Sequence, residues 1–167
     1  MITITEFEPD FAMAFPDLCE ALKNGPLVVH DAVSRVTLHG SRGPAGGFQD
    51  NSDIDLCLIV DGEQYSYLSQ DEELLKDIIY TTLAEWRGSL KLDLRVDFDL
   101  RKCGLKCFDE SHYKAGICAG GGLDCFGIYE FEDGQPVYVI NSSMNVKSIY
   151  PCVLIWRKQE KARGLFF

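Results

Sequence analysis

The chain has 167 residues, of which 46% are hydrophobic and 25% are charged, and this balance is typical of a globular domain rather than a disordered or fibrous protein. Its formal net charge of −10 argues against nucleic acid or an anionic membrane as a partner. The longest apolar run, Tyr150 to Trp156, is too short to cross a bilayer, and the acidic start of the chain lacks a secretory pattern. We therefore expect a single domain over residues 1–167, located in the cytoplasm.

The first elements predicted along the chain are a helix and two strands. Apolar side chains recur at helical intervals over residues 8–24, where Pro16 is expected to divide the helix. Residues 33–39 are predicted to form a strand, followed by a loop over 43–52 that is rich in Gly, Asn and Asp. Residues 54–60 are nearly all apolar, which predicts a central strand covered on both faces.

A second helix and a third strand complete the predicted core. Residues 68–87 have a helical apolar face and acidic residues in the first turn, where the helix dipole favours them. Residues 91–100 alternate between apolar and charged side chains, as a half-buried strand does. This order predicts an α/β (α+β) core over about residues 1–100, in which helices pack on one side of a small mixed sheet.

The remainder, about residues 101–167, is predicted to be a β-rich, irregular elaboration of the same domain. Short apolar runs predict strands at 126–131 and 137–140, with a turn at Asp133-Gly134 between them. The basic residues gather toward the end of the chain: Lys147, Arg157, Lys158, Lys161 and Arg163. We interpret this end as a solvated helix terminus, with contact to phosphates as the alternative.

Four of the seven cysteines also lie in this elaboration: Cys103, Cys107, Cys118 and Cys125. Four thiolates can hold a structural zinc ion. Their spacing lacks the tight pairs of zinc-binding motifs, which favours buried or free thiols. A cysteine-based metal or redox module is a separate hypothesis, which stoichiometric zinc or iron in the purified protein would support.

A small polar turn, Gly40-Ser41-Arg42, follows the first predicted strand. Gly40 has no Cβ and lets the backbone approach a phosphate, while Ser41 and the neighbouring amides can donate hydrogen bonds to it. The Arg42 guanidinium is suited to neutralise phosphate charge. A surface arginine paired with Asp50 or Asp53 is the alternative.

Two carboxylates come next, at the start of the central strand. Asp53 and Asp55 are two residues apart, so their side chains point the same way and repel each other. A divalent cation removes this repulsion, and Mg²⁺ prefers carboxylates together with substrate phosphates and water. The turn and the two acids therefore predict a site for metal and nucleotide together.

The strand predicted over 91–100 offers further carboxylates. Asp93, Asp97 and Asp99 share one face of it with Arg95. These three acids cannot all be metal ligands in a two-metal site that already has Asp53 and Asp55.

Gly40-Ser41, the loop and Asp53-Ile54-Asp55 together resemble the signature of the nucleotidyltransferase superfamily typified by DNA polymerase beta. The match is closer to the small, minimal nucleotidyltransferases and covers roughly residues 36–60. The resemblance implies a nucleotidyltransferase-like fold. It also implies that Gly40, Ser41 and Arg42 contact the nucleotide phosphates.

In this family a third carboxylate on a later strand completes the metal site. Asp97 is our choice, because Arg95-Val96-Asp97-Phe98 resembles the family's third motif, and Asp99 is the second choice. Asp93 is expected to be offset by Arg95 or solvated. The resemblance thus implies that Asp53, Asp55 and Asp97 hold two Mg²⁺ ions and are the catalytic residues.

The expected activity is Mg²⁺-dependent transfer of a nucleoside monophosphate from an NTP such as ATP to an acceptor hydroxyl, with release of pyrophosphate. The acceptor would belong to a small molecule or a protein. No helical acceptor-binding region is apparent in the sequence, so that a partner chain or a second copy is expected to complete the acceptor site. The alternative is a non-catalytic regulator or partner-binding protein with the nucleotidyltransferase fold.

Overall fold

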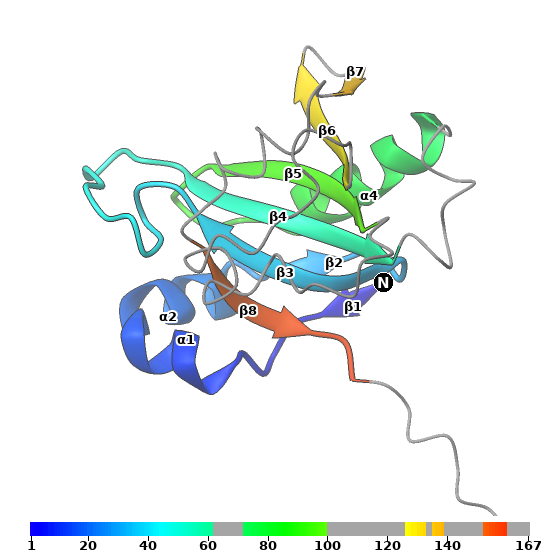
Figure 1. Ribbon diagram of the computed structural model, residues 1–167. Coiled ribbons are helices and arrows are strands. Elements are labelled where there is room, and N and C mark those ends of the chain that lie inside the picture. Colours follow the sequence, from blue (N-terminus) through cyan, green and yellow to red (C-terminus); the bar gives the residue numbers. More distant parts are fainter. Residues whose placement is uncertain (62–71, 100–125, 133–134, 139–151, 160–167) are drawn as a thin grey trace, which may run out of the picture.

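The computed structural model describes residues 1–61, 72–99, 126–132, 135–138 and 152–159, and Figure 1 shows the arrangement of their elements. The helices among them are α1 (Pro9–Ala14), α2 (Pro16–Asn24) and α4 (Glu72–Glu85). The strands are β1 (Ile2–Thr3), β2 (Val28–Val29), β3 (Val33–His39), β4 (Ile54–Asp61), β5 (Leu92–Asp99), β6 (Phe126–Glu132), β7 (Gln135–Tyr138) and β8 (Val153–Arg157).

Six strands form one mixed sheet in the order β7-β6-β5-β4-β3-β8, and β1 and β2 form a separate pair. β4 and β5 run parallel, while the other neighbours in the sheet are antiparallel. A parallel pair requires a crossover connection, and α4 lies in the chain between these two strands. The described part of the chain is therefore a mixed α/β fold with a small mixed sheet, as expected.

One face of the sheet carries the hydrophobic core. The inward residues of β4 are all fully buried: Ile54, Leu56, Leu58 and Val60. They belong to one cluster with residues from the three described helices, namely Phe11, Cys19, Leu22, Leu75, Ile78 and Ile79. Because side chains alternate along a strand, Asp55 on β4 and Asp93 and Asp97 on β5 lie on the opposite face.

The structure confirms most of the predicted elements. α2 begins at Pro16, as the predicted division of the first helix requires, and β3 has the predicted bounds. The strand predicted at 137–140 is confirmed over its described residues, and β7 (Gln135–Tyr138) begins two residues earlier than predicted. The turn at Asp133-Gly134 and the four clustered cysteines (Cys103, Cys107, Cys118 and Cys125) lie outside the described residues.

The interpretation of the basic end as a helix terminus is wrong for its described portion. Val153–Arg157 forms strand β8 beside β3. Its β-branched and aromatic residues favour an extended backbone, which explains the outcome. Arg157 pairs with Glu8 at 3.2 Å, and the Lys158 ammonium donates to the Asp31 carbonyl at 2.6 Å. None of the described helices is long and apolar enough to span a membrane.

Candidate functional site

The centre of the candidate site is a pair of carboxyl groups on the two parallel strands. Asp55 of β4 lies directly opposite Asp93 of β5. The pKa of Asp55 is raised to about 6, first by burial, then by a hydrogen bond and charge from Asp93, and further by the charge of Asp53. Asp55 is therefore mostly ionised near pH 7 at a cost in free energy, and a cation bound beside it would relieve that cost.

Gly40 packs against the Asp55 member of this pair. Its φ of +70° lies in the left-handed region, which favours glycine. A Cβ built on Gly40 would overlap the carboxyl group of Asp55, with Oδ2 as the nearest atom. Both the conformation and the close approach therefore require glycine, and they bring the backbone of the turn directly against the acid.

Arg42 fixes the loop between β3 and β4. Its Nε donates to the Ser52 carbonyl at 2.8 Å, and its terminal nitrogen donates to the carbonyls of Gln49 at 3.0 Å and Asp50 at 3.2 Å. The guanidinium also lies over the ring of Phe48, 4.7 Å from its centroid. Arg42 thus neither pairs with the Asp50 or Asp53 carboxylates nor projects freely toward a phosphate. It ties the loop down just before Asp53.

Replacing Arg42 by alanine should loosen this loop. Three charge-assisted hydrogen bonds to carbonyls are lost, so we expect chymotrypsin to cleave after the exposed Phe48 at least about tenfold faster. Timed digestion with mass spectrometry of the fragments measures this rate. Arg87→Ala is the control, because the Arg87 guanidinium donates to the Ala84 and Trp86 carbonyls next to it in the chain. Equal cleavage after Phe48 in both variants would contradict the role given to Arg42.

Asp97, expected as the third acid, does not lie beside Asp55. It is opposite Ile59, four residues along β5 from Asp93, and four residues of strand span about 13 Å. Its side chain is fully buried near Cys57, whose pKa is raised by burial and, to a smaller extent, by Asp97. Asp99 is farther still, with its backbone opposite Asp61. The structure instead brings Asp93 beside Asp55, and the exposed side chain of Asp93 agrees with our expectation that it is solvated.

His39 lies on the β3 side of Asp55, because the register of β3 and β4 places it opposite that residue. Its side chain is buried, and its Nδ1 lies 3.6 Å from the Cys57 sulfur. Burial, and secondarily the charge of Arg95, lowers the pKa of His39 to about 4. The imidazole is therefore neutral near pH 7 and adds no charge to the site.

The pKa values of His39 and Asp55 predict opposing effects of pH on stability. The contribution of His39 is present above pH 6.5 and is lost as the pH falls through about 4. The contribution of Asp55 is present below its ordinary pKa of 3.8 and is lost as the pH rises through about 6. The variant Asp55→Asn lacks the pH dependence that comes from Asp55 and keeps the one that comes from His39. Urea unfolding between about pH 4 and pH 7 should therefore show a steeper rise of stability with pH in this variant than in the wild type; parallel curves would contradict the raised pKa of Asp55.

The oxygen donors suit Mg²⁺, although the site is not complete in itself. Among residues 1–61, 72–99 and the shorter described segments, no three His, Cys, Asp or Glu side chains converge as a ready-made metal site. Asp55 and Asp93 supply two carboxyl groups, and Asp53 lies immediately before β4. Mg²⁺ is commonly held by one or two carboxylates plus substrate phosphates. The donor set thus fits a cation that binds together with a phosphorylated ligand.

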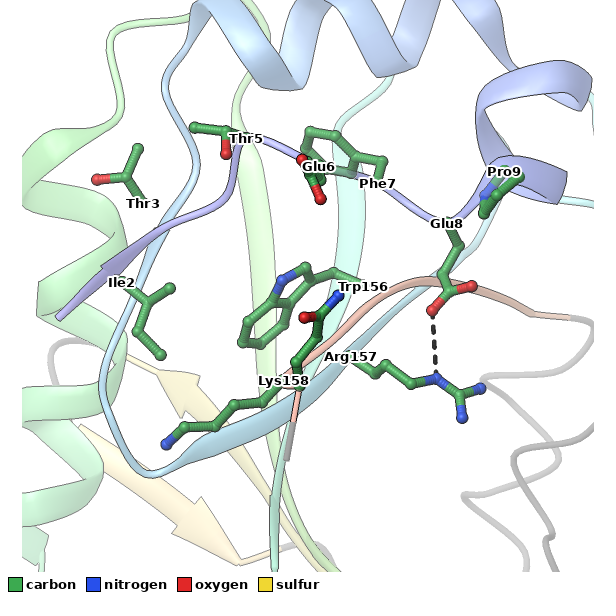
Figure 2. A pocket seen from close by; sticks show the side chains of 11 residues that line it. Ile2, Thr3, Thr5, Glu6, Phe7, Glu8, Pro9, Trp156, Arg157 and Lys158 are labelled. Carbon is green, nitrogen blue, oxygen red and sulfur yellow. Dashed lines mark hydrogen bonds and ion pairs between the residues drawn. The ribbon is translucent and has the colours of Figure 1, made fainter. Parts of the chain in front are cut away.

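A hollow of about 550 Å³ lies elsewhere, between the N-terminal segment and β8. Figure 2 shows Trp156 and Lys158 in it, with Glu8 and Arg157 paired at its edge. The register of β3 and β8 places Arg157 opposite Arg35, whereas Val153 is opposite Leu38, next to the turn. The hollow is therefore at the opposite end of these strands from Asp55 and Gly40, and it is not part of the candidate site.

Comparison with known proteins adds no relative that would identify the site. No protein-family model matches the chain, and no curated protein matches it in sequence.

Proposed function

We propose that this chain is a Mg²⁺-dependent nucleotidyltransferase that moves a nucleoside monophosphate from an NTP to an acceptor hydroxyl. The observation that carries the proposal is the packing of the Gly40 turn against Asp55, which is itself paired with Asp93 on the parallel neighbouring strand. A turn whose backbone lies against an oxygen ligand for a cation suits a triphosphate with its metal. The order of strand, loop, strand, helix and strand supports a nucleotidyltransferase-like fold.

Each residue of the site has a proposed role. Asp55 and Asp93 supply the oxygen ligands, and Asp53, just before β4, adds negative charge beside them. The amides of Gly40 and Ser41 donate to the phosphates, while Arg42 acts indirectly by holding the loop that leads to Asp53. Bound Mg²⁺ would neutralise charge on the phosphates and on the attacking and leaving oxygens.

The proposed reaction is an in-line displacement. The acceptor oxygen forms a bond to the α-phosphorus, the bond from that phosphorus to the bridging oxygen breaks, and pyrophosphate leaves with the bond's electron pair. The carboxylate of Asp93 accepts the proton of the acceptor hydroxyl. The acceptor belongs to a small molecule or a protein, and a partner chain or second copy would complete its pocket. Most of the rate enhancement would come from positioning and charge neutralisation.

Thermal shift with ATP, GTP, CTP and UTP, each with and without Mg²⁺, tests the proposal. A ligand at about 100 times its Kd stabilises the folded state by about 2.7 kcal/mol, which for a chain of this size raises Tm by roughly 5–10 °C. We expect this shift to require Mg²⁺ and to be lost in Asp93→Asn. Absence of any Mg²⁺-dependent shift in the wild type would overturn the proposal.

A non-catalytic protein with the same fold is the second candidate. The observation that favours it is that the described residues hold no ready-made cluster of three metal ligands. A non-catalytic protein without a nucleotide site predicts no Mg²⁺-dependent shift, whereas one that binds nucleotide predicts a shift without release of pyrophosphate, so a pyrophosphate assay beside the thermal shift separates the two.

A further inference from the structure

The loop between β3 and β4 presents one aromatic ring to solvent. Phe48 is 57% exposed. The Arg42 guanidinium covers one face of the ring at 4.7 Å and is itself held by the Gln49, Asp50 and Ser52 carbonyls. The Gln49 amide also donates to the Ser52 hydroxyl at 2.8 Å. The contact with Arg42 therefore holds the exposed ring in place.

The ring belongs to the same end of the sheet as the acid pair. Gly40 touches Asp55, and Arg42 follows two residues later, so their Cα atoms are at most about 7 Å apart. Phe48 lies under the Arg42 guanidinium. Figure 1 shows this loop projecting beyond the ends of β3 and β4. A nucleotide whose phosphates lie at Gly40 and Asp55 would extend its sugar and base away from the metal, and a base directed along the loop would meet this ring.

We infer that Phe48 is the stacking surface for the nucleobase of the bound triphosphate. This inference rests on the proposed function, because it places the phosphates at Gly40 and Asp55. A flat base stacks on an aromatic ring through its π-face, and this interaction is tolerant of base identity because every base has such a face. The guanidinium on the other face of Phe48 adds a positive charge next to the stack. The site therefore binds several NTPs with similar affinity and distinguishes a nucleotide from bare triphosphate.

The test compares ATP with inorganic tripolyphosphate, both with Mg²⁺, by isothermal titration calorimetry. Base–aromatic stacking corresponds to roughly a 5- to 100-fold gain in affinity. We expect wild type to bind ATP tighter than tripolyphosphate by such a factor, Phe48→Ala to lose this difference, and Phe48→Tyr to keep it. Tripolyphosphate affinity should be the same in all three proteins. Tyr80→Ala, which removes an exposed aromatic side chain on α4, is the control and should behave as wild type.

Failure of the inference is distinguishable from failure of the proposed function. Equal ATP preference in wild type and Phe48→Ala, with Mg²⁺-dependent binding of both ligands, would overturn the stacking role and leave the triphosphate site in place. Absence of Mg²⁺-dependent binding of either ligand to the wild type would overturn the proposed function, and the inference with it. In Phe48→Trp, quenching of the new indole fluorescence by ATP and not by tripolyphosphate would support the stack directly; no difference between the two ligands would count against it.

Discussion

Asp55→Asn is expected to abolish Mg²⁺-dependent NTP binding while leaving the ligand-free protein at least as stable as the wild type near pH 7. Burial, and then the neighbouring Asp93, raise the pKa of the Asp55 carboxyl group to about 6. At pH 7 its ionised form therefore costs free energy in the folded state, and an amide removes that cost. The same amide is a poor substitute for a charged metal ligand, since Mg²⁺ prefers carboxylate oxygens.

Two measurements on one preparation check this expectation: urea unfolding without ligand, and the Tm shift with ATP and Mg²⁺. Asp77→Asn is the matched control, because it makes the same chemical change on the exposed side of α4 and should alter neither quantity appreciably. A large loss of ligand-free stability in Asp55→Asn would mean that the carboxylate has a structural role. Undiminished nucleotide binding in that variant would remove Asp55 from the site.

Among glycine-to-alanine substitutions in the loop, Gly40→Ala is expected to disrupt the site most. The alanine must adopt a left-handed conformation at φ +70°, and its Cβ must displace the Asp55 carboxyl group. The first effect costs about 1–2 kcal/mol, and the overlap adds roughly 1–3 kcal/mol. Because the displaced group is the proposed metal ligand, the variant should also lose Mg²⁺-dependent nucleotide binding.

Gly46→Ala separates these two effects. Gly46 has a similar φ of +73°, but a Cβ there has no neighbouring atom within 4 Å. It should therefore lose only the conformational term of about 1–2 kcal/mol and keep its nucleotide affinity. If both variants unfold at the same urea concentration and bind nucleotide equally, then contact between Gly40 and Asp55 is not important for the site.

Local patterns in the sequence predicted the elements that hold the site. The apolar run after Asp53 and the polar turn at Gly40 correctly located the end of β3 and the start of β4. Pro16 correctly marked the division between α1 and α2, because proline is tolerated at the first position of a helix and disrupts its interior. These features depend on neighbouring residues alone, and such information is fully present in a sequence.

Which acid of β5 lies beside Asp55 depends on the register between β4 and β5. The alternation of apolar and charged residues along β5 cannot reveal that register. Asp93 and Asp97 lie on the same face of β5, and only the pairing of Ile54 with Leu92 places Asp93 rather than Asp97 beside Asp55. One usable signal existed: Asp55 and Asp93 are each the second residue of their strands. The partners of Arg42 were also inaccessible, because they are backbone carbonyls and carry no side-chain signature.

Binding of Mn²⁺ in the presence of ATP, followed by electron paramagnetic resonance, tests the central claim most directly. Mn²⁺ accepts the same oxygen ligands as Mg²⁺. Because ATP itself binds Mn²⁺, the reference is Mn²⁺–ATP without protein. We predict that the wild type changes the spectrum of Mn²⁺–ATP beyond this reference, and that Asp93→Asn does not do so while remaining folded by circular dichroism. Retained binding in Asp93→Asn, or no ATP-dependent binding in the wild type, would contradict a metal–triphosphate site built on Asp55 and Asp93.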